Sequence, residues 1–170
     1  MLEMKLAGIA LDAATRSPIV LLQDTADRRQ LPIFIGQEQA RAIINALDNQ
    51  NPPRPLTHDL MVNVIEEWDL ELEKVIIHSL QDNTFYATLI MRNGEITKEL
   101  DARPSDAIAL ALRTDSPIWV MEEVIADASI PVDRDADEAE RKAFRDFLSG
   151  LKPEDFAQRG GLSSSGEEAS

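Results

Sequence analysis

The chain has 170 residues, with 31 acidic and 17 basic side chains, a formal net charge of −14 and no cysteine. That length indicates one domain with at most an appendage, and a core that needs no disulfide or metal to fold. The absence of cysteine excludes thiol catalysis and cysteine-ligated zinc, and leaves His58 and His78 as the two histidines. The acidic balance alone argues against a nucleic-acid partner, because phosphate binding depends on Lys and Arg.

The cellular setting follows from the same reading. Glu3 stands where a secretory signal would be basic, and no apolar run reaches the ~18 residues that span a membrane. We therefore expect a cytoplasmic protein with no membrane partner. An apolar face left by residues 118–130 would need a cover from the C-terminal segment or from a second subunit, and we expect a homo-oligomer.

The first half of the chain predicts three strands and a helix. Residues 3–12, 17–24 and 31–35 have strand character, and Gly36 ends the third strand. From residue 37 the period becomes helical, since apolar residues recur at i, i+3, i+4 and i+7, namely at Ala40, Ile43, Ile44 and Leu47. A proline-punctuated loop follows at 48–55.

A second helix is expected after that loop, with Thr57 as its N-cap. Its apolar residues show the same helical spacing, at Met61, Val64, Ile65 and Trp68.

The second half repeats the pattern. Residues 72–80 and 84–92 are rich in β-branched and aromatic residues, and Asn93-Gly94 is a strong hairpin signal before a strand at 95–100. Pro104 suits the first turn of a third helix, whose residues 107–112 are apolar all round and should be buried. A short strand is expected at 117–120.

The two halves therefore predict a pseudo-duplicated α+β fold. Each half is a β-β-β-α unit, and the two helix ends, at 42–47 and 107–112, are 65 residues apart. Neither unit could cover its own sheet, so we expect them to share one mixed, mostly antiparallel sheet with helices packed against it.

The composition changes after Pro131. We expect a domain at 1–130, a helical appendage at 131–157 and a disordered tail at 158–170. The appendage carries an apolar stripe that must dock on something, formed by Phe144, Phe147, Leu148 and Leu151.

Two predicted helix starts concentrate polar side chains. The first lies at 53–60 and contributes Arg54, Thr57, His58 and Asp59, and the second lies at 101–106 and contributes Asp101, Arg103, Ser105 and Asp106. Helix N-termini favour anions, because free N–H groups and the positive end of the dipole meet there. If the two starts lie together, their side chains suit phosphodiester hydrolysis.

Each residue type has a role in such a cleft. His58 is the candidate acid or base, because imidazole changes charge close to working pH. Asp59, Asp101 and Asp106 are catalytic candidates and candidate ligands of a divalent cation, Mg²⁺ or Mn²⁺, the one cofactor expected. Arg54 and Arg103 match phosphate oxygens, with Thr57 and Ser105 as further substrate contacts.

Plain structural readings stand beside these roles. Thr57 would serve as a cap alone, and Asp59 and Asp106 would only complement the helix dipole. Arg103 would pair with Asp101 or Asp106 in a structural ion pair. His58 would be an ordinary hydrogen-bonded histidine, and His78, on a strand, is a sheet-face residue.

Three ordered blocks carry a family resemblance: Leu31-Pro32-Ile33-Phe34-Ile35-Gly36, residues 53–60 and residues 101–111. Across roughly 4–130 the chain resembles the bifunctional nuclease domain family, as a short bacterial member without the UvrB/UvrC-like C-terminal motif. The resemblance implies hydrolysis of DNA and RNA, with nucleic acid as the partner. Three residues after Gly36 such sequences usually place a glutamate, whereas this chain has Gln39 beside Glu38.

Two hypotheses follow from the sequence. The first is a nuclease whose cleft lies between the second and third helix starts. The second is a non-catalytic module that binds an anion or a protein partner, which the acidic surface and the capping readings favour. Whether His58 and Asp106 share one site separates the two hypotheses.

Overall fold

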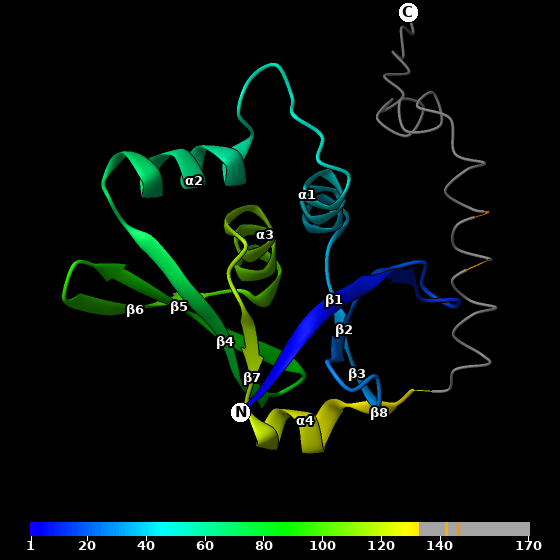
Figure 1. Cartoon of the computed structure of the whole chain (residues 1–170). Coiled ribbons are helices and arrows are strands. Elements are labelled where there is room, and N and C mark those ends of the chain that lie inside the picture. Colours follow the sequence, from blue (N-terminus) through cyan, green and yellow to red (C-terminus); the bar gives the residue numbers. More distant parts are fainter. Residues whose placement is uncertain (133–141, 143–145, 147–170) are drawn as a thin grey trace, which may run out of the picture. The chain divides into compact units, whose positions relative to one another are not determined.

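A computed structural model describes residues 1–132, together with 142 and 146. The described strands and helices are labelled in Figure 1. The strands are β1 (Leu2–Leu11), β2 (Pro18–Asp24), β3 (Arg29–Phe34), β4 (Glu71–Gln81), β5 (Thr84–Asn93), β6 (Ile96–Ala102), β7 (Ile118–Val120) and β8 (Ile130–Pro131). The helices are α1 (Gln37–Leu47), α2 (Thr57–Glu67), α3 (Pro104–Thr114) and α4 (Glu122–Ala128).

One compact unit runs from Met1 to Val132. Strand β8 belongs to this unit, because Ile130 pairs with Gln30 of β3. The helical appendage expected at 131–157 and the tail expected at 158–170 lie outside the described residues, apart from 131, 132, 142 and 146.

All eight described strands form one sheet in the order β6-β5-β4-β7-β1-β2-β3-β8. Every neighbouring pair is antiparallel except β4 and β7, which are parallel. The expected α+β fold, with a mixed and mostly antiparallel sheet and helices packed against it, is confirmed.

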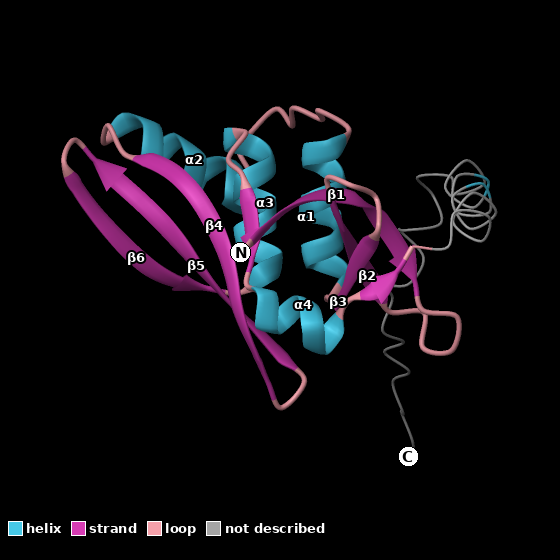
Figure 2. Cartoon of the chain, turned by 60° about the horizontal axis from the view of Figure 1, so that its bottom comes forward, coloured by secondary structure: helices cyan, strands magenta, loops and turns pink. Residues whose placement is uncertain are grey.

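The sheet is built from two three-stranded meanders, each followed by helix. Strands β1, β2 and β3 form one side of the sheet and β4, β5 and β6 form the other (Figure 2), and β7 lies between β1 and β4 (Figure 1). Because β7 runs parallel to β4 and antiparallel to β1, the first strands of the two meanders point in opposite directions. A two-fold axis perpendicular to the sheet relates such units, which matches the predicted duplication.

The core lies between the sheet and the pair α1 and α3. Helix α3 packs on α1, on α2 and on strands β4 and β5. Its residues Ala107 to Ala111 are all buried, as expected from a run that is apolar all round, whereas Leu112, the last residue of that run, is half-buried. The alternating alanines let neighbouring elements approach closely, while Ile108 and Leu110 fill the space between them. The sheet contributes the fully buried Val75 and Ile77.

The two tight turns of the second meander use residues that accept positive φ. Asp82 and Asn83 have φ of 48° and 59° and form the two-residue loop between β4 and β5. The next loop is formed by Gly94 and Glu95, since Asn93 pairs with Ile96. The expected Asn93-Gly94 loop is therefore wrong by one residue, because Gly94, with φ of 59°, takes the first loop position.

Helix α4 and strand β8 were not expected from the sequence. Helix α4 has seven residues and buries Val124 and Ile125, where it packs against β4 and β3. Two apolar contacts in seven residues are too few for a periodic signal. Within the described part of the chain, no helix has the length and apolar character needed to cross a lipid bilayer.

Candidate active site

Helix α2 carries the first group of predicted site residues and lies against α3. The prolines at 52, 53 and 55 keep the preceding loop out of helical geometry. The helix begins at Thr57, with Leu56 as the N-cap, so the expected N-cap role of Thr57 is wrong. Capping falls instead to Asp59, whose Oδ2 accepts a hydrogen bond from the backbone N–H of Leu56 at 3.0 Å.

The first turns of α2 and α3 meet through one pair of side chains. Nε2 of His58 lies 3.0 Å from Oδ1 of Asp106. The other oxygen of Asp106 accepts a hydrogen bond from Nε of Arg103 at 2.8 Å, and it forms an ion pair with the terminal nitrogen Nη2 at 2.7 Å. Of the alternatives for Arg103, the pair with Asp106 is confirmed. We call His58, Asp106 and Arg103 the histidine cluster.

The histidine cluster is partly open to solvent. The side chains of His58 and Asp106 are 14% and 28% exposed, and that of Arg103 is 68% exposed. A carboxylate that accepts the Nε2 proton fixes the neutral imidazole in the tautomer whose Nδ1 carries the lone pair. The arrangement can therefore move a proton at Nδ1 while the guanidinium of Arg103 holds the other oxygen of Asp106.

Asp59 belongs to a different contact. Its Oδ1 accepts a hydrogen bond from Nε of Arg113 at 2.8 Å. The remaining nitrogens of Arg113 donate to the backbone oxygens of Ala109, at 2.8 Å, and Ala42, at 3.0 Å. One guanidinium thus joins α1, α2 and α3. The hydrogen bond from Arg113 is the main cause that lowers the pKa of Asp59, against an opposing effect of burial.

The structure does not gather all the predicted site residues. Asp101 pairs with Thr88, which pairs with Ile76, so by strand alternation it points to the sheet face opposite the buried Val75 and Ile77. Its carboxylate is therefore separated from that of Asp106.

The remaining predicted contacts lie at the two helix starts. Arg54 is exposed in the loop before α2, and Thr57 is exposed at the first position of that helix. Ser105 is buried in the first turn of α3. Their roles in binding substrate stay predictions.

A metal ion needs several ligands in one place, and the predicted carboxylates do not supply them. Among residues 1–132, 142 and 146, no three His, Asp or Glu side chains gather closely enough to hold a metal ion. Asp59 and Asp106 are each engaged by arginine, and Asp101 faces elsewhere. The residues present do not fit a three-carboxylate metal centre, so participation of Mg²⁺ or Mn²⁺ stays a prediction.

Gln39, which stands where a glutamate was expected, folds back over the start of α1. Its side-chain oxygen occupies the place that a Cβ atom on Gly36 would take. Gly36 is the N-cap of this helix, and Glu or Gln three residues later commonly reaches back to that position.

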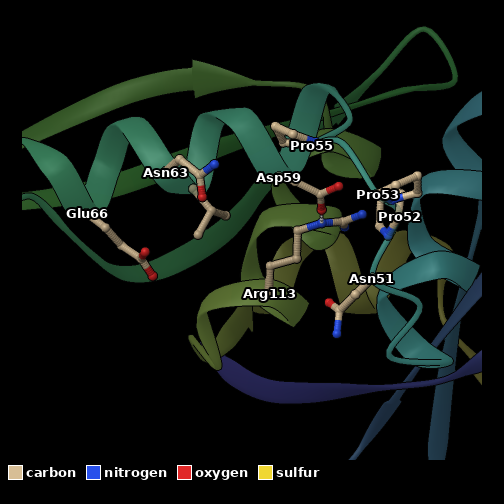
Figure 3. Close-up of a pocket in the computed structure, with 9 residues that line it drawn as sticks. Asn51, Pro52, Pro53, Pro55, Asp59, Asn63, Glu66 and Arg113 are labelled. Carbon is tan, nitrogen blue, oxygen red and sulfur yellow. Dashed lines mark hydrogen bonds and ion pairs between the residues drawn. The ribbon is translucent and has the colours of Figure 1, made fainter.

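Arg113 was missed by the sequence reasoning, as was the hollow that it helps to form. The hollow has a volume of about 370 Å³ and lies between α2 and the proline-rich loop (Figure 3). Asp59 and Arg113 line it, but His58 and Asp106 do not. The one signal for Arg113 was a basic residue in the last turn of a predicted helix.

The fold and the site define a small α+β domain in which two related units place a histidine–carboxylate pair between two helix starts. The chain belongs to the bifunctional nuclease domain family, whose model matches residues 20–133.

Individual relatives agree with this assignment. An uncharacterized protein of Mycobacterium tuberculosis is 39% identical over 163 residues, which is 91% of this chain and 97% of that protein. Bifunctional nuclease 1 of Oryza sativa subsp. japonica is 30% identical over 112 residues, and the protein of the same name from Arabidopsis thaliana is 26% identical over 112 residues. The matched segment spans 64% of this chain and 34% of each plant protein.

Proposed function

We propose that this protein is a nuclease that hydrolyses phosphodiester bonds of DNA or RNA at the histidine cluster. The observation that carries the proposal is the 3.0 Å contact between Nε2 of His58 and Oδ1 of Asp106, made by residues 48 positions apart. The family membership and the names of the plant relatives support the same class of activity.

His58 acts as the general acid or base. Asp106 holds its Nε2 proton, so that Nδ1 takes the proton of the attacking water and later returns a proton to the leaving oxygen. A carboxylate in this position also stabilises the imidazolium that forms during the reaction. The His58 side chain is 14% exposed, and the proposal requires that a substrate oxygen reaches its Nδ1.

Arg103 has two tasks. Two of its nitrogens orient Asp106, and its remaining N–H groups extend from a side chain that is mostly exposed. A guanidinium offers five donors in a fixed plane, which suits the oxygens of a phosphate. Arg54, exposed in the loop before α2, adds a second positive charge. These charges reduce the local repulsion of an acidic protein towards its substrate.

A second candidate function is a non-catalytic module that binds an anion. One observation favours it: Asp59 and Asp106, the carboxylates at the two helix starts, are each neutralised by an arginine. Such a module would bind a phosphate compound beside Arg103 without cleaving any nucleic acid.

A cleavage assay separates the two functions. Labelled DNA and RNA are incubated with the protein in EDTA, Mg²⁺ or Mn²⁺, and the same substrates are given to His58→Ala and Asp106→Asn. We expect each change to lower the cleavage rate about 10²- to 10⁴-fold, the usual contribution of a positioned acid or base.

His78→Ala is the matched control, because His78 is the other histidine and lies on β4, where its ring is 6.5 Å from that of Tyr86. It should cleave like the wild type. Unchanged cleavage by folded His58→Ala protein would rule out this site, and binding of inorganic phosphate without any cleavage by the wild type would support the module.

The proposal also covers the cellular compartment and the oligomeric state of the protein. We propose a cytoplasmic homo-oligomer, and the exposed apolar side chains of α2 support an assembled state. Leu60, Val64 and Trp68 are 54%, 49% and 73% exposed and share one side of the helix. The mass in solution, measured by light scattering, should exceed that of one chain.

A further inference from the structure

The hollow between α2 and the proline-rich loop has two unlike walls. Asp59, Asn63 and Glu66 form a polar stripe at i, i+4 and i+7 on α2. Figure 3 shows the other side, where the rings of Pro52 and Pro53 and the amide of Asn51 lie, with the ring of Pro55 beside Asp59 at the start of α2. Its volume of about 370 Å³ is within the range of pockets that hold small molecules.

The charges in the hollow disfavour a phosphate. The guanidinium of Arg113 is committed to Asp59 and to the backbone oxygens of Ala109 and Ala42. Asp59 and Arg113 therefore form a neutral pair, and Glu66 leaves the hollow with a negative charge. The hollow therefore disfavours an anionic group and suits a neutral ligand that offers hydrogen-bond donors to carboxylate and amide oxygens.

The polar side chains that remain are available to such a ligand. Within the described part of the chain, the side chains of Asn51, Asn63 and Glu66 form no hydrogen bond or ion pair. Amide side chains pair with the edges of bases, and a carboxylate accepts hydrogen bonds from a base amino group. Proline rings provide an apolar surface for the face of a flat heterocycle.

The hollow also lies next to the histidine cluster, where the base of a bound nucleotide would be expected. Asp59 lines it, while the preceding residue, His58, turns to Asp106 in the histidine cluster. A base seated beside Asp59 would leave its own phosphate close to that cluster.

We propose that this hollow binds the base of a nucleotide next to the cleaved phosphodiester, and that it prefers bases with an exocyclic amino group. This inference rests on the proposed function. Adenine, cytosine and guanine offer an amino group to Glu66 and to the amide oxygens, whereas uracil offers a ring N–H alone. The hollow would therefore make the protein prefer nucleic acids whose base at this position carries an amino group.

Binding of short oligonucleotides tests the inference. Fluorescein-labelled octamers of A, C and U are titrated with the wild-type protein, and the fluorescence anisotropy gives each Kd. Probe integrity is checked on a gel. We expect the A and C octamers to bind about tenfold more tightly than the U octamer, the discrimination of one good base contact.

Glu66→Ala and Glu67→Ala form a matched pair. Both changes remove one negative charge from neighbouring exposed positions of α2, but Glu67 does not line the hollow. The loss of charge should tighten all three probes equally in Glu67→Ala, whereas in Glu66→Ala the lost contact should weaken the A and C probes relative to the U probe. The ratio of Kd for U to Kd for A should fall below about threefold in Glu66→Ala and stay near tenfold in Glu67→Ala.

Equal binding of the three octamers by the wild type, the same ratio in both variants, or no binding of any octamer would each overturn the inference. These results are independent of cleavage. A protein that discriminates between octamers but never cleaves keeps the base site and loses the nuclease. A protein that cleaves without discrimination keeps the nuclease and loses the base site.

Discussion

Asp106 illustrates how a single carboxylate can serve two side chains from different elements. One oxygen faces the imidazole of His58, and the other accepts a hydrogen bond from Nε of Arg103 and forms an ion pair with its terminal nitrogen. The plain reading of an acid in the first turn of a helix, as a partner of the dipole alone, therefore does not describe it. Arg103 is the N-cap of α3 and Asp106 lies in the first turn, so the two side chains are close in the chain and pair locally.

Arg103→Lys tests whether the planar fork matters. A lysine keeps the positive charge but cannot hold one oxygen of Asp106 and contact a phosphate at the same time. We expect kcat/KM for cleavage to fall about 10- to 100-fold, with the thermal midpoint of unfolding nearly unchanged. Arg54→Lys, at an exposed loop position, should have a smaller effect, and equal effects of the two changes would contradict the role given to Arg103.

Asp24 makes the free energy of unfolding depend on pH in the acidic range. Burial alone would raise the pKa of its carboxyl, but hydrogen bonds from the backbone N–H groups of Arg28 and Arg29 outweigh burial and lower it. Because the pKa is lowered, the ionised carboxylate of Asp24 stabilises the fold at any pH above about 4, the ordinary pKa of an aspartate. That contribution is lost as the pH falls through the pKa of the folded state.

We therefore expect the free energy of unfolding to decrease below about pH 4. In Asp24→Asn that decrease should be smaller, and the protein should be less stable at pH 7. Asp27→Asn is the control, because Asp27 is exposed with φ of 53°, a conformation that asparagine also accepts. Chemical denaturation between pH 3 and 7 measures the difference, and parallel curves for Asp24→Asn and wild type would contradict it.

At the scale of elements, Arg113 fixes the position of α2. This helix buries little apolar surface of its own, because Ile65 is its one buried residue. The guanidinium of Arg113, whose side chain is 10% exposed, compensates by joining Asp59 to α3 and to Ala42 in the middle of α1. The orientation of His58 thus depends on an ion pair outside the histidine cluster.

A double-mutant cycle measures this link. Arg113→Ala should cost about 2–4 kcal/mol, because it removes three hydrogen bonds of a charged group and leaves Asp59 unpaired. Asp59→Ala should cost less, and the double variant should be less destabilised than the sum of the two. The exposed pair of Arg92 and Glu71 is the comparison, with a coupling below about 1 kcal/mol. Additive effects at 59 and 113 would mean that the pair does not hold α2.

The elements themselves could be predicted from the sequence because their signals are local. Each signal shows which side of an element is buried, whatever the neighbouring elements are. Examples are the apolar period of α1, the all-apolar run of α3 and the β-branched strands. Position in space is different. Residues 58 and 106 were expected to meet, yet nothing local showed that Asp59 would turn to Arg113, 54 positions away, and divide the expected cleft in two.

For the whole molecule, the net charge limits how nucleic acid can bind. With a net charge of −14, attraction must come from few local positive charges, and Arg54 and Arg103 are those at the proposed site. Each phosphate neutralised contributes about −0.7 to the slope of log K against log salt for a single strand. We expect a slope of about −1.4 for a single-stranded probe.

The slope is measured by anisotropy over a series of salt concentrations. Arg54→Ala and Arg103→Ala should each reduce its magnitude by about 0.7. Arg92→Ala, on β5, should leave the slope unchanged. A wild-type slope steeper than about −4 would show that a larger basic surface takes part.

The place of β7 between β4 and β1 determines when the sheet can be completed during synthesis. Strand β1 pairs with β7 at residues 118–120. The centre of the sheet therefore stays open until more than two thirds of the chain has left the ribosome. Until then the nascent polypeptide carries two separate hairpin systems with unsatisfied inner edges. Closure of such distant partners is slow, and premature pairing with another chain is the main hazard on the way to the native state.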